Sequence, residues 1–184
     1  MIKTERLILR PFKHEDYKDV FECCNDYDVV KTTLGMPWPY TEEMAQGWIA
    51  KHEGNRKSGL SCEFAICYKQ NPEKVIGCVS LVNINPVAKR AELGYWVGKK
   101  YWKQGIATEA SVALMEYGFN ELNLNSIFAR FFDINPASGK VMQKCGMNYV
   151  GKMRQHEFRF DKFYDVVYYE ILKEDFISKY PTMC

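Results

Sequence analysis

Apolar residues recur along this chain in two spacings, one typical of strands and one typical of helices. Segments in which they alternate or run together predict strands at residues 2–10, 62–69, 75–85, 91–97, 126–133, 149–160 and 163–172. Apolar residues spaced three and four positions apart predict helices at residues 14–24, 41–52, 105–122 and 135–146. The order β-α-α-β-β-β-α-β-α-β-β predicts an α/β domain of about seven strands and about four helices.

Residues that typically begin or end helices support several of these boundaries. Thr41 is expected to cap its helix, with acidic residues following it in the first turn. Asn135 is expected as the cap of the last predicted helix, with Pro136 at its first position and Gly146 ending it. The aromatic stretch at 36–40 and the polar stretch at 54–59 are expected as loops.

Composition narrows the class of protein. A chain of 184 residues that is 47% hydrophobic is long enough for one full core. The formal net charge of +2 favours neither nucleic acid nor membrane as a partner. The short apolar run at the start is interrupted by arginines, so no signal peptide is expected, and no transmembrane segment is present.

The cysteines and histidines indicate a reducing, metal-free context. No pair of cysteines forms a CxxC, and several lie in apolar periodic stretches, which predicts reduced core thiols in a cytoplasmic protein. The cysteines are Cys23, Cys24, Cys62, Cys67, Cys78, Cys145 and Cys184. The three histidines show no metal-ligand spacing, so no metal is expected.

The stretch from 91 to 110 carries the strongest chemical signal. It reads as an apolar strand, a basic turn and a helix that opens around Gly105. A strand that enters a helix through small residues aims unpaired backbone N–H groups out of the helix start, which is a site for phosphate. The chain lacks both the P-loop run and the GxGxxG dinucleotide fingerprint.

A third pattern fits this segment. The run Trp102-Lys103-Gln104-Gly105-Ile106-Ala107-Thr108-Glu109-Ala110 resembles motif A of the GNAT acetyltransferase superfamily, in the branch of the ribosomal-protein N-terminal acetyltransferases. Lys103 stands where that branch usually has glycine. The resemblance covers nearly the whole chain, because the order of elements also matches. It includes the opening residues 5–11, Asn135 with Ser138, and residues 144–147.

The resemblance implies a fold, a reaction and partners. It implies a single GNAT domain over residues 1–184, with a mixed, mostly antiparallel twisted sheet. It implies an N-acetyltransferase that uses acetyl-CoA, with direct attack by an amine in a ternary complex. A protein N-terminal α-amine is the first choice of acceptor, and a small-molecule amine such as a polyamine is the second. A non-catalytic acyl-CoA-binding module is the rival. Homodimers are frequent in this branch.

The resemblance also assigns residues to the acetyl-CoA site. Backbone groups of the central strand would pair with pantetheine as an added strand, and the pyrophosphate would lie on the turn. The residues so assigned are Tyr95, Trp96, Val97, Trp102, Lys103, Gln104, Gly105, Ile106, Ala107, Thr108, Asn135 and Ser138. At least one of Lys99, Lys100 and Lys103 is expected to approach a phosphate. The alternatives are an ordinary buried strand, a plain helix cap and a solvated basic turn.

Two residues are candidates for catalysis. Glu92 lies on the same face of the central strand as Gly94 and Trp96, and is the candidate base, acting directly or through water. The alternative for Glu92 is an ion pair with Lys89 or Arg90. Ser138 is the candidate acid for the departing thiolate, and its alternative is a local hydrogen bond.

The acceptor side is less determined. Candidate substrate-lining residues are Arg10, Trp38, Tyr40 and Phe131, although isolated aromatic residues are more often core. Lys152, Arg154 and His156 share one face of the penultimate predicted strand, either to meet an acidic substrate or as a wet outer face.

Overall fold

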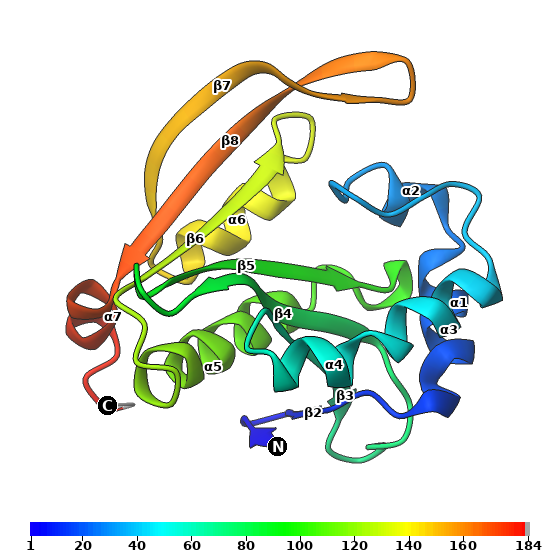
Figure 1. Cartoon of the computed structure of the whole chain (residues 1–184), viewed down its shortest axis with the longest axis horizontal. Coiled ribbons are helices and arrows are strands. Elements are labelled where there is room, and N and C mark those ends of the chain that lie inside the picture. The colour runs from blue at the N-terminus through cyan, green and yellow to red at the C-terminus, as the bar shows by residue number, and fades with distance from the viewer. Residues whose placement is uncertain (183–184) are drawn as a thin grey trace.

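The computed structural model describes residues 1–182 and contains an eight-stranded sheet (Figure 1). The strand order is β1-β2-β3-β4-β5-β6-β8-β7. Neighbouring strands pair antiparallel, apart from the parallel pair β5–β6. The strands are β1 Ile2–Lys3, β2 Leu7–Arg10, β3 Cys62–Tyr68, β4 Gly77–Asn85, β5 Arg90–Val97, β6 Ser126–Phe132, β7 Asn148–Arg159 and β8 Lys162–Leu172. The predicted mixed, mostly antiparallel sheet is confirmed.

Helices cover both faces of the β2–β5 half of this sheet. The α-helices are α1 Tyr17–Cys24, α2 Tyr27–Val30, α3 Glu42–Ala50, α4 His52–Lys57, α5 Ile106–Asn120, α6 Pro136–Lys144 and α7 Lys173–Lys179, and the 3₁₀ turns are η1 His14–Asp16 and η2 Lys99–Tyr101. Helix α5 contacts β4 and β5 on one face, and α4 contacts β3. Because both faces of β3 are covered, its residues from 62 to 67 are all buried.

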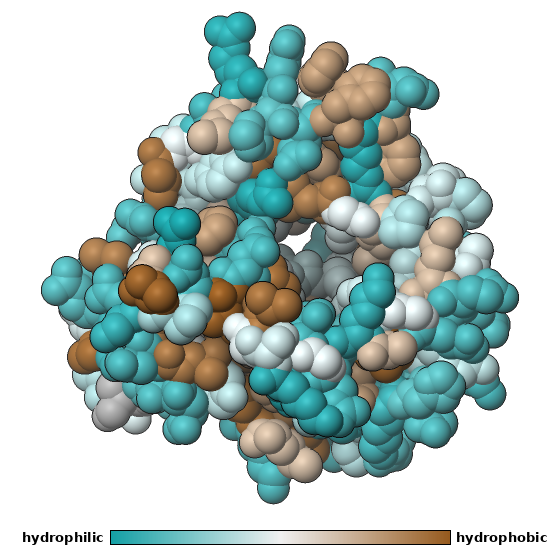
Figure 2. Space-filling model, viewed as in Figure 1, coloured by the Kyte–Doolittle hydropathy of each residue, from teal (hydrophilic) through white to brown (hydrophobic). Residues whose placement is uncertain are grey.

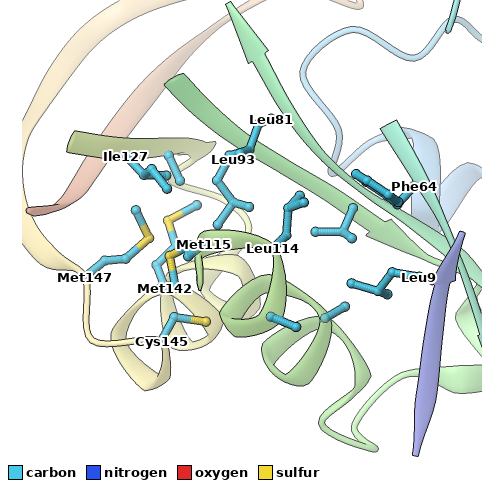
Figure 3. Close-up of a cluster of buried hydrophobic side chains, with 14 of the residues drawn as sticks. Leu9, Phe64, Leu81, Leu93, Leu114, Met115, Ile127, Met142, Cys145 and Met147 are labelled. Carbon is cyan, nitrogen blue, oxygen red and sulfur yellow. The ribbon is translucent and has the colours of Figure 1, made fainter. Parts of the chain in front are cut away.

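The main core lies between the sheet and helices α5, α6 and α7. In the close-up of Figure 3, Leu81 and Leu93 from the sheet point toward Leu114 and Met115 of α5. Met142 and Cys145 extend the same cluster from α6. A second cluster joins α1 and α3, with Tyr40 and the partly buried Trp96 packed into it. These two clusters fix β5 between the helix layers.

The structure corrects several predicted elements. The predicted strand at 2–10 is a hairpin of β1 and β2, because the chain turns between Thr4 and Leu7, where the Thr4 amide donates to the Leu7 carbonyl over 3.0 Å. The polar stretch predicted as a loop at 54–59 is largely helix α4. Two short helices, α2 and α7, were not predicted from the sequence.

Of the two predicted helix caps, the structure confirms one and corrects the other. The Thr41 hydroxyl accepts from the Met44 amide, which confirms its role as a cap. Asn135 occupies the cap position of α6, but its side chain makes no capping bond. Instead its Nδ2 donates to the Thr32 carbonyl over 3.3 Å, which ties the start of α6 to the α2–α3 loop. Gly146 follows α6 with a φ of 90°, as a helix-ending glycine does.

Six of the seven cysteines are buried and free, which confirms the prediction of core thiols for them. Burial raises the pKa of Cys145 to about 12 and that of Cys62 to about 11. These thiols therefore stay protonated at neutral pH. Cys184 lies outside the described residues.

The strands β5 and β6 diverge in the middle of the sheet. Their pairing begins at Arg90↔Ser126 and has its last pair at Glu92↔Phe128. Beyond that point β5 continues alongside β4 as far as Val97, and β6 continues alongside β8 as far as Phe132. This divergence leaves one edge of β5, from Leu93 to Val97, facing the cavity described below (Figure 1). In residues 1–182 no helix is both long and apolar enough to cross a bilayer.

Candidate functional site: a cavity between two diverging strands

A cavity of about 820 Å³ opens where β5 and β6 separate. Its walls come from β5, the start of α5, helix α6, and the segment from α2 to α3. The space-filling view shows the molecule hollowed at its centre, below the β7–β8 hairpin (Figure 2). Distant parts of the sequence therefore meet around one space, as a site for two ligands requires.

The turn before α5 has the backbone conformation that a phosphate site needs. Lys103 and Gly105 have φ values of 62° and 77°, so the chain is left-handed at both positions. The first bond within α5 runs from the Glu109 amide to the Gly105 carbonyl, so the amides of Ile106, Ala107 and Thr108 precede the helical ladder. All the predicted turn residues, 102–108, line the cavity. The helix start therefore presents its donors to the cavity.

Side chains from the N-terminal hairpin brace this turn. Arg6 donates from Nη1 to the Gln104 carbonyl over 3.0 Å and pairs with the Glu109 carboxylate through its Nε, over 2.7 Å. The Trp102 indole donates to the Val97 carbonyl over 2.7 Å, which joins the turn to β5. Sequence analysis missed the bracing role of Arg6 and Glu109, although both lie in the segments that carry the family resemblance.

The structure distinguishes the three lysines of which at least one is expected to approach a phosphate. Lys99 lies 2.6 Å from Asp28, and Lys100 lies 2.6 Å from Glu22, so both ammonium groups face carboxylates of α1 and α2. Lys103 is the one of the three predicted lysines that lines the cavity. Lys140 and Lys144 of α6 also line it, one helical turn apart, and sequence analysis missed them. The sequence does contain a signal for them, because they are four residues apart in the helix that follows Asn135 and so share one face of it.

Glu92 lies on the cavity wall with both carboxylate oxygens bonded. It is 9% exposed, and it accepts from Arg130 Nε over 2.8 Å and from Asn83 Nδ2 over 2.9 Å. Arg130 also donates to Glu157 over 2.7 Å. The expected alternative of an ion pair therefore holds, but the cation is Arg130 rather than Lys89 or Arg90. Arg130 reaches Glu92 because β6 runs beside β5. This pairing could not be predicted from the sequence.

Ser138 and Tyr95 form a second polar group on the cavity wall. The Tyr95 hydroxyl lies 2.8 Å from Ser138 Oγ and donates to the Ser138 carbonyl over 3.0 Å. Burial raises the pKa of Tyr95, so its hydroxyl remains protonated at neutral pH. Sequence analysis assigned only the backbone of Tyr95 to the site and missed the role of its side chain.

The predicted acceptor residues are only partly brought together. Tyr40 and Phe131 line the cavity. Arg10 does not line it, because Arg10 is buried in an ion pair with Asp16 at 2.7 Å. Trp38 also lies outside the lining; it is 42% exposed and packs edge-on against Tyr27.

The basic face predicted on the penultimate strand is exposed, and one of its residues is in an ion pair. Lys152 lies 2.9 Å from Asp165 of the neighbouring strand. A register irregularity between Met153 and Glu157 interrupts the pairing of β7 with β8 around Arg154 and His156. The expectation of a wet outer face fits the exposure of all three residues. Among the residues that the structure describes, no cluster of three or more potential ligands could hold a metal ion.

Comparison with known proteins identifies the family. Residues 6–148 match the model of the acetyltransferase (GNAT) domain, so the chain belongs to the GNAT acetyltransferase family. The acetyltransferase (GNAT family) from Bacillus anthracis has a similar crystal structure, with a TM-score of 0.83 and 30% identity. That comparison covers 94% of this chain and 98% of the other. The protein is therefore an N-acetyltransferase with the GNAT fold.

Two characterised classes of acceptor occur among its relatives. The chain is 30% identical to the ribosomal-protein-serine acetyltransferase of Escherichia coli (strain K12), over 70% of this chain and 68% of that protein. It is 29% identical to the spermidine N(1)-acetyltransferase of the same strain, over 82% of this chain and 76% of that protein. Similarity alone therefore leaves the acceptor open between a protein and a polyamine.

Proposed function

We propose that this protein transfers the acetyl group of acetyl-CoA to the α-amine of a polypeptide. The observation that carries the proposal is the cavity between β5 and β6, whose lining includes both the phosphate-type turn and the Glu92 carboxylate. A long phosphorylated ligand and an amine could therefore meet in this one cavity. The non-catalytic alternative is disfavoured because the polar groups at the centre of the cavity are intact.

The acetyl-CoA end uses backbone donors and cations. The amides at the start of α5 would hold the pyrophosphate, with the helix dipole behind them. Lys103, Lys140 and Lys144 line the same cavity and would add positive charge near the phosphates. The unpaired edge of β5, from Leu93 to Val97, would pair with the pantetheine amides as an added strand. The Val97 carbonyl is already bonded to Trp102, so the pairing would use the residues before it.

The reaction needs two proton movements at the centre of the cavity. The amine nitrogen attacks the thioester carbonyl carbon, the carbon–sulfur bond breaks, and the acceptor ammonium gives up two protons in all. One proton ends on the CoA thiol and the other is released. Glu92 would accept the proton from the ammonium, directly or through water, and Arg130 and Asn83 hold its two carboxylate oxygens in place.

The leaving group would receive its proton near Ser138. The Ser138 hydroxyl lies at the start of α6 and on the cavity wall, where a departing thiolate would meet it. Tyr95 holds that hydroxyl through the bond of 2.8 Å. We propose Ser138 as the donor to the thiolate and Tyr95 as the residue that positions it.

An α-amine suits this site better than a polyamine does. Glu92 is the single carboxylate among the residues that line the cavity, all of which lie in the described part of the chain. Its charge is already offset by Arg130. An α-amine with a pKa near 8 costs about 1.4 kcal/mol to deprotonate at pH 7, whereas a lysine amine costs about 4.6 kcal/mol. A site with a single carboxylate as its base fits the amine whose proton is easier to remove.

Two measurements test the proposal in order. Calorimetric titration with acetyl-CoA and CoA, with ATP and NAD as controls, is expected to show saturable binding of the CoA species alone. Release of CoA thiol is then measured with short peptides and with spermidine as acceptors, and the products are identified by mass spectrometry. Acetylated peptide α-amines support the proposal. Binding of acetyl-CoA without turnover on any acceptor would favour the non-catalytic module.

The compartment and the oligomeric state belong to the same proposal. We propose a reducing, cytoplasmic location, supported by six free and buried thiols within residues 1–182. A homodimer stays a prediction. Light scattering of the purified protein across a range of concentrations measures it directly.

A further inference from the structure

One end of the cavity is built from apolar and aromatic side chains. We define the acceptor chamber as the six residues Leu34, Met36, Tyr40, Met44, Trp48 and Trp96, all of which line the cavity. They come from the α2–α3 segment, helix α3 and β5. Trp48 and Trp96 bring their rings within 6.2 Å of each other. The Tyr40 side chain is buried, which raises the pKa of its hydroxyl and keeps it neutral.

The chamber and the proposed base lie on the same face of β5. Glu92, Gly94 and Trp96 share one face of β5, because side chains two apart on a strand point the same way. Leu93 and Val97 point to the opposite face, into the core with α5. The chamber therefore lies on the same side of β5 as the Glu92 carboxylate.

Gly94 lies between Glu92 and Trp96 on this face of β5 and carries no side chain. A Cβ atom at Gly94 would lie 3.0 Å from Ser80 Oγ, on the face that carries both side chains. Glu92 and Trp96 are four residues apart, which is about 13 Å along the strand. An amine that gives its proton to Glu92 directly or through water would lie over Gly94, with the substituent on its α-carbon directed toward Trp96.

The charge of the chamber limits what that substituent can be. Glu92 is the single carboxylate that lines the cavity, within the described residues, and it is paired with Arg130 at 2.8 Å. Additional ammonium groups of a polyamine would be desolvated against aromatic and thioether groups with no carboxylate to pair with. An apolar substituent gains free energy by leaving water for the same surface.

We propose that the acceptor is a polypeptide whose first residue has a large apolar side chain, such as methionine, leucine or phenylalanine. This inference rests on the proposed function, since it names the class of α-amine that the site accepts. The chamber would hold the first side chain while Glu92 receives the proton from the adjacent amine. Small or charged first residues would leave the chamber unfilled or bring an unpaired charge into it.

The test uses peptides that are identical except at the first residue. Peptides beginning with Met, Leu, Phe, Ala, Ser, Lys or Asp, and spermidine, are compared by kcat/KM for thiol release. Burial of a large apolar side chain is expected to raise kcat/KM by roughly tenfold or more over Ala and Ser. Met44→Glu should lower the rate on the Leu peptide and raise it on the Lys peptide. Met153→Glu is the matched control, because Met153 is exposed on β7 and lies outside the cavity lining.

The possible results distinguish a failure of the chamber inference from a failure of the proposed α-amine acetylation. If the Ala or Ser peptides are acetylated fastest, the chamber inference is overturned and the polypeptide α-amine proposal stands. If spermidine is fastest, or if no peptide is acetylated although acetyl-CoA binds, both are overturned. If Met44→Glu leaves the ranking of peptides unchanged, Met44 does not contact the first residue and the chamber is wrongly placed.

Discussion

Arg130 Nε lies 2.8 Å from Glu92 Oε1 and joins β6 to β5 at the position where the two strands stop pairing. The ion pair therefore connects the two strands close to the point where they begin to separate. It also bonds the candidate base, whose other oxygen accepts from Asn83. The same arginine continues to Glu157 on β7, which links the two halves of the sheet across the cavity.

Replacing Glu92 tests its role as base. Glu92→Gln keeps the shape of the side chain and removes the proton acceptor, so kcat should fall by ~10²- to 10⁴-fold. The affinity for CoA, measured by calorimetry, should stay within about twofold, because the phosphate turn lies elsewhere on the cavity wall. Glu53→Gln is the control, since Glu53 sits in an exposed ion pair with Lys57 away from the cavity. A Glu92→Gln enzyme with the wild-type rate and pH profile would rule out the proposed base.

Replacing Arg130 tests the ion pair rather than the base. Arg130→Met removes the donor that holds Glu92 Oε1 over 2.8 Å, so kcat should fall while the affinity for CoA, measured by calorimetry, stays within about twofold. Arg130→Lys keeps a charge but has a different donor geometry, and should lie between the variant and wild type. A wild-type kcat in Arg130→Met would show that the ion pair does not position the base.

Lys103 occupies a left-handed position where its family branch usually has glycine. A residue with a side chain there costs roughly 1–2 kcal/mol, so Lys103→Gly should raise the free energy of unfolding by about 1 kcal/mol. Lys103→Ala keeps the unfavourable φ of 62° and removes the same charge. Both variants should bind CoA more weakly, and urea denaturation should show the gain in stability for the glycine alone. Equal stabilities would mean that the turn relaxes around either residue.

From the Tyr95–Ser138 pair we expect removal of the Ser138 hydroxyl to lower kcat more than removal of the Tyr95 hydroxyl. Ser138→Ala removes the proposed donor to the thiolate, and Tyr95→Phe removes the hydroxyl that holds it at 2.8 Å. General-acid assistance is worth ~10²-fold or more, so Ser138→Ala should reduce kcat by that order, and Tyr95→Phe should reduce it less. The double variant should match Ser138→Ala alone, because the two groups act as one unit. Additive losses would show that Tyr95 acts independently of Ser138.

His52 predicts a loss of stability in weak acid. Both of its ring nitrogens are buried with no hydrogen-bond partner in the described residues. Burial, with Arg56 nearby, lowers the pKa of His52 to about 4. The unfolded chain therefore binds a proton near pH 6.5 while the folded chain does not, and the free energy of unfolding falls from pH 6.5 toward pH 4 by up to about 3 kcal/mol.

The His52 prediction is measured by urea denaturation at several pH values. His52→Phe keeps an aromatic ring between Phe12 and Trp48 and should flatten the pH dependence over this interval. A change at the exposed His14 is the matched control. An unchanged slope in His52→Phe would assign the acid sensitivity to other groups.

The sequence by itself determined the order of the elements and the chemistry of the turn before α5. Apolar periodicity is a local property, so most of the long strands and α5 were predicted within a few residues. The turn could be recognised because small residues between a strand and a helix leave backbone amides free to bind a phosphate, and because all of these residues are close in the sequence. Short helices such as α2 and α7 were missed, since a single turn carries too little periodicity to be recognised.

The tertiary structure alone decided which side chains meet across the cavity. Helix α5 separates Arg130 from Glu92 in the sequence, and only the parallel register of β5 and β6 brings the two side chains together. Arg10 was assigned to the acceptor and instead pairs with Asp16. Strand pairing and the divergence of β5 from β6 are long-range contacts, and their register is set by packing on both faces of the sheet rather than by any local run of residues.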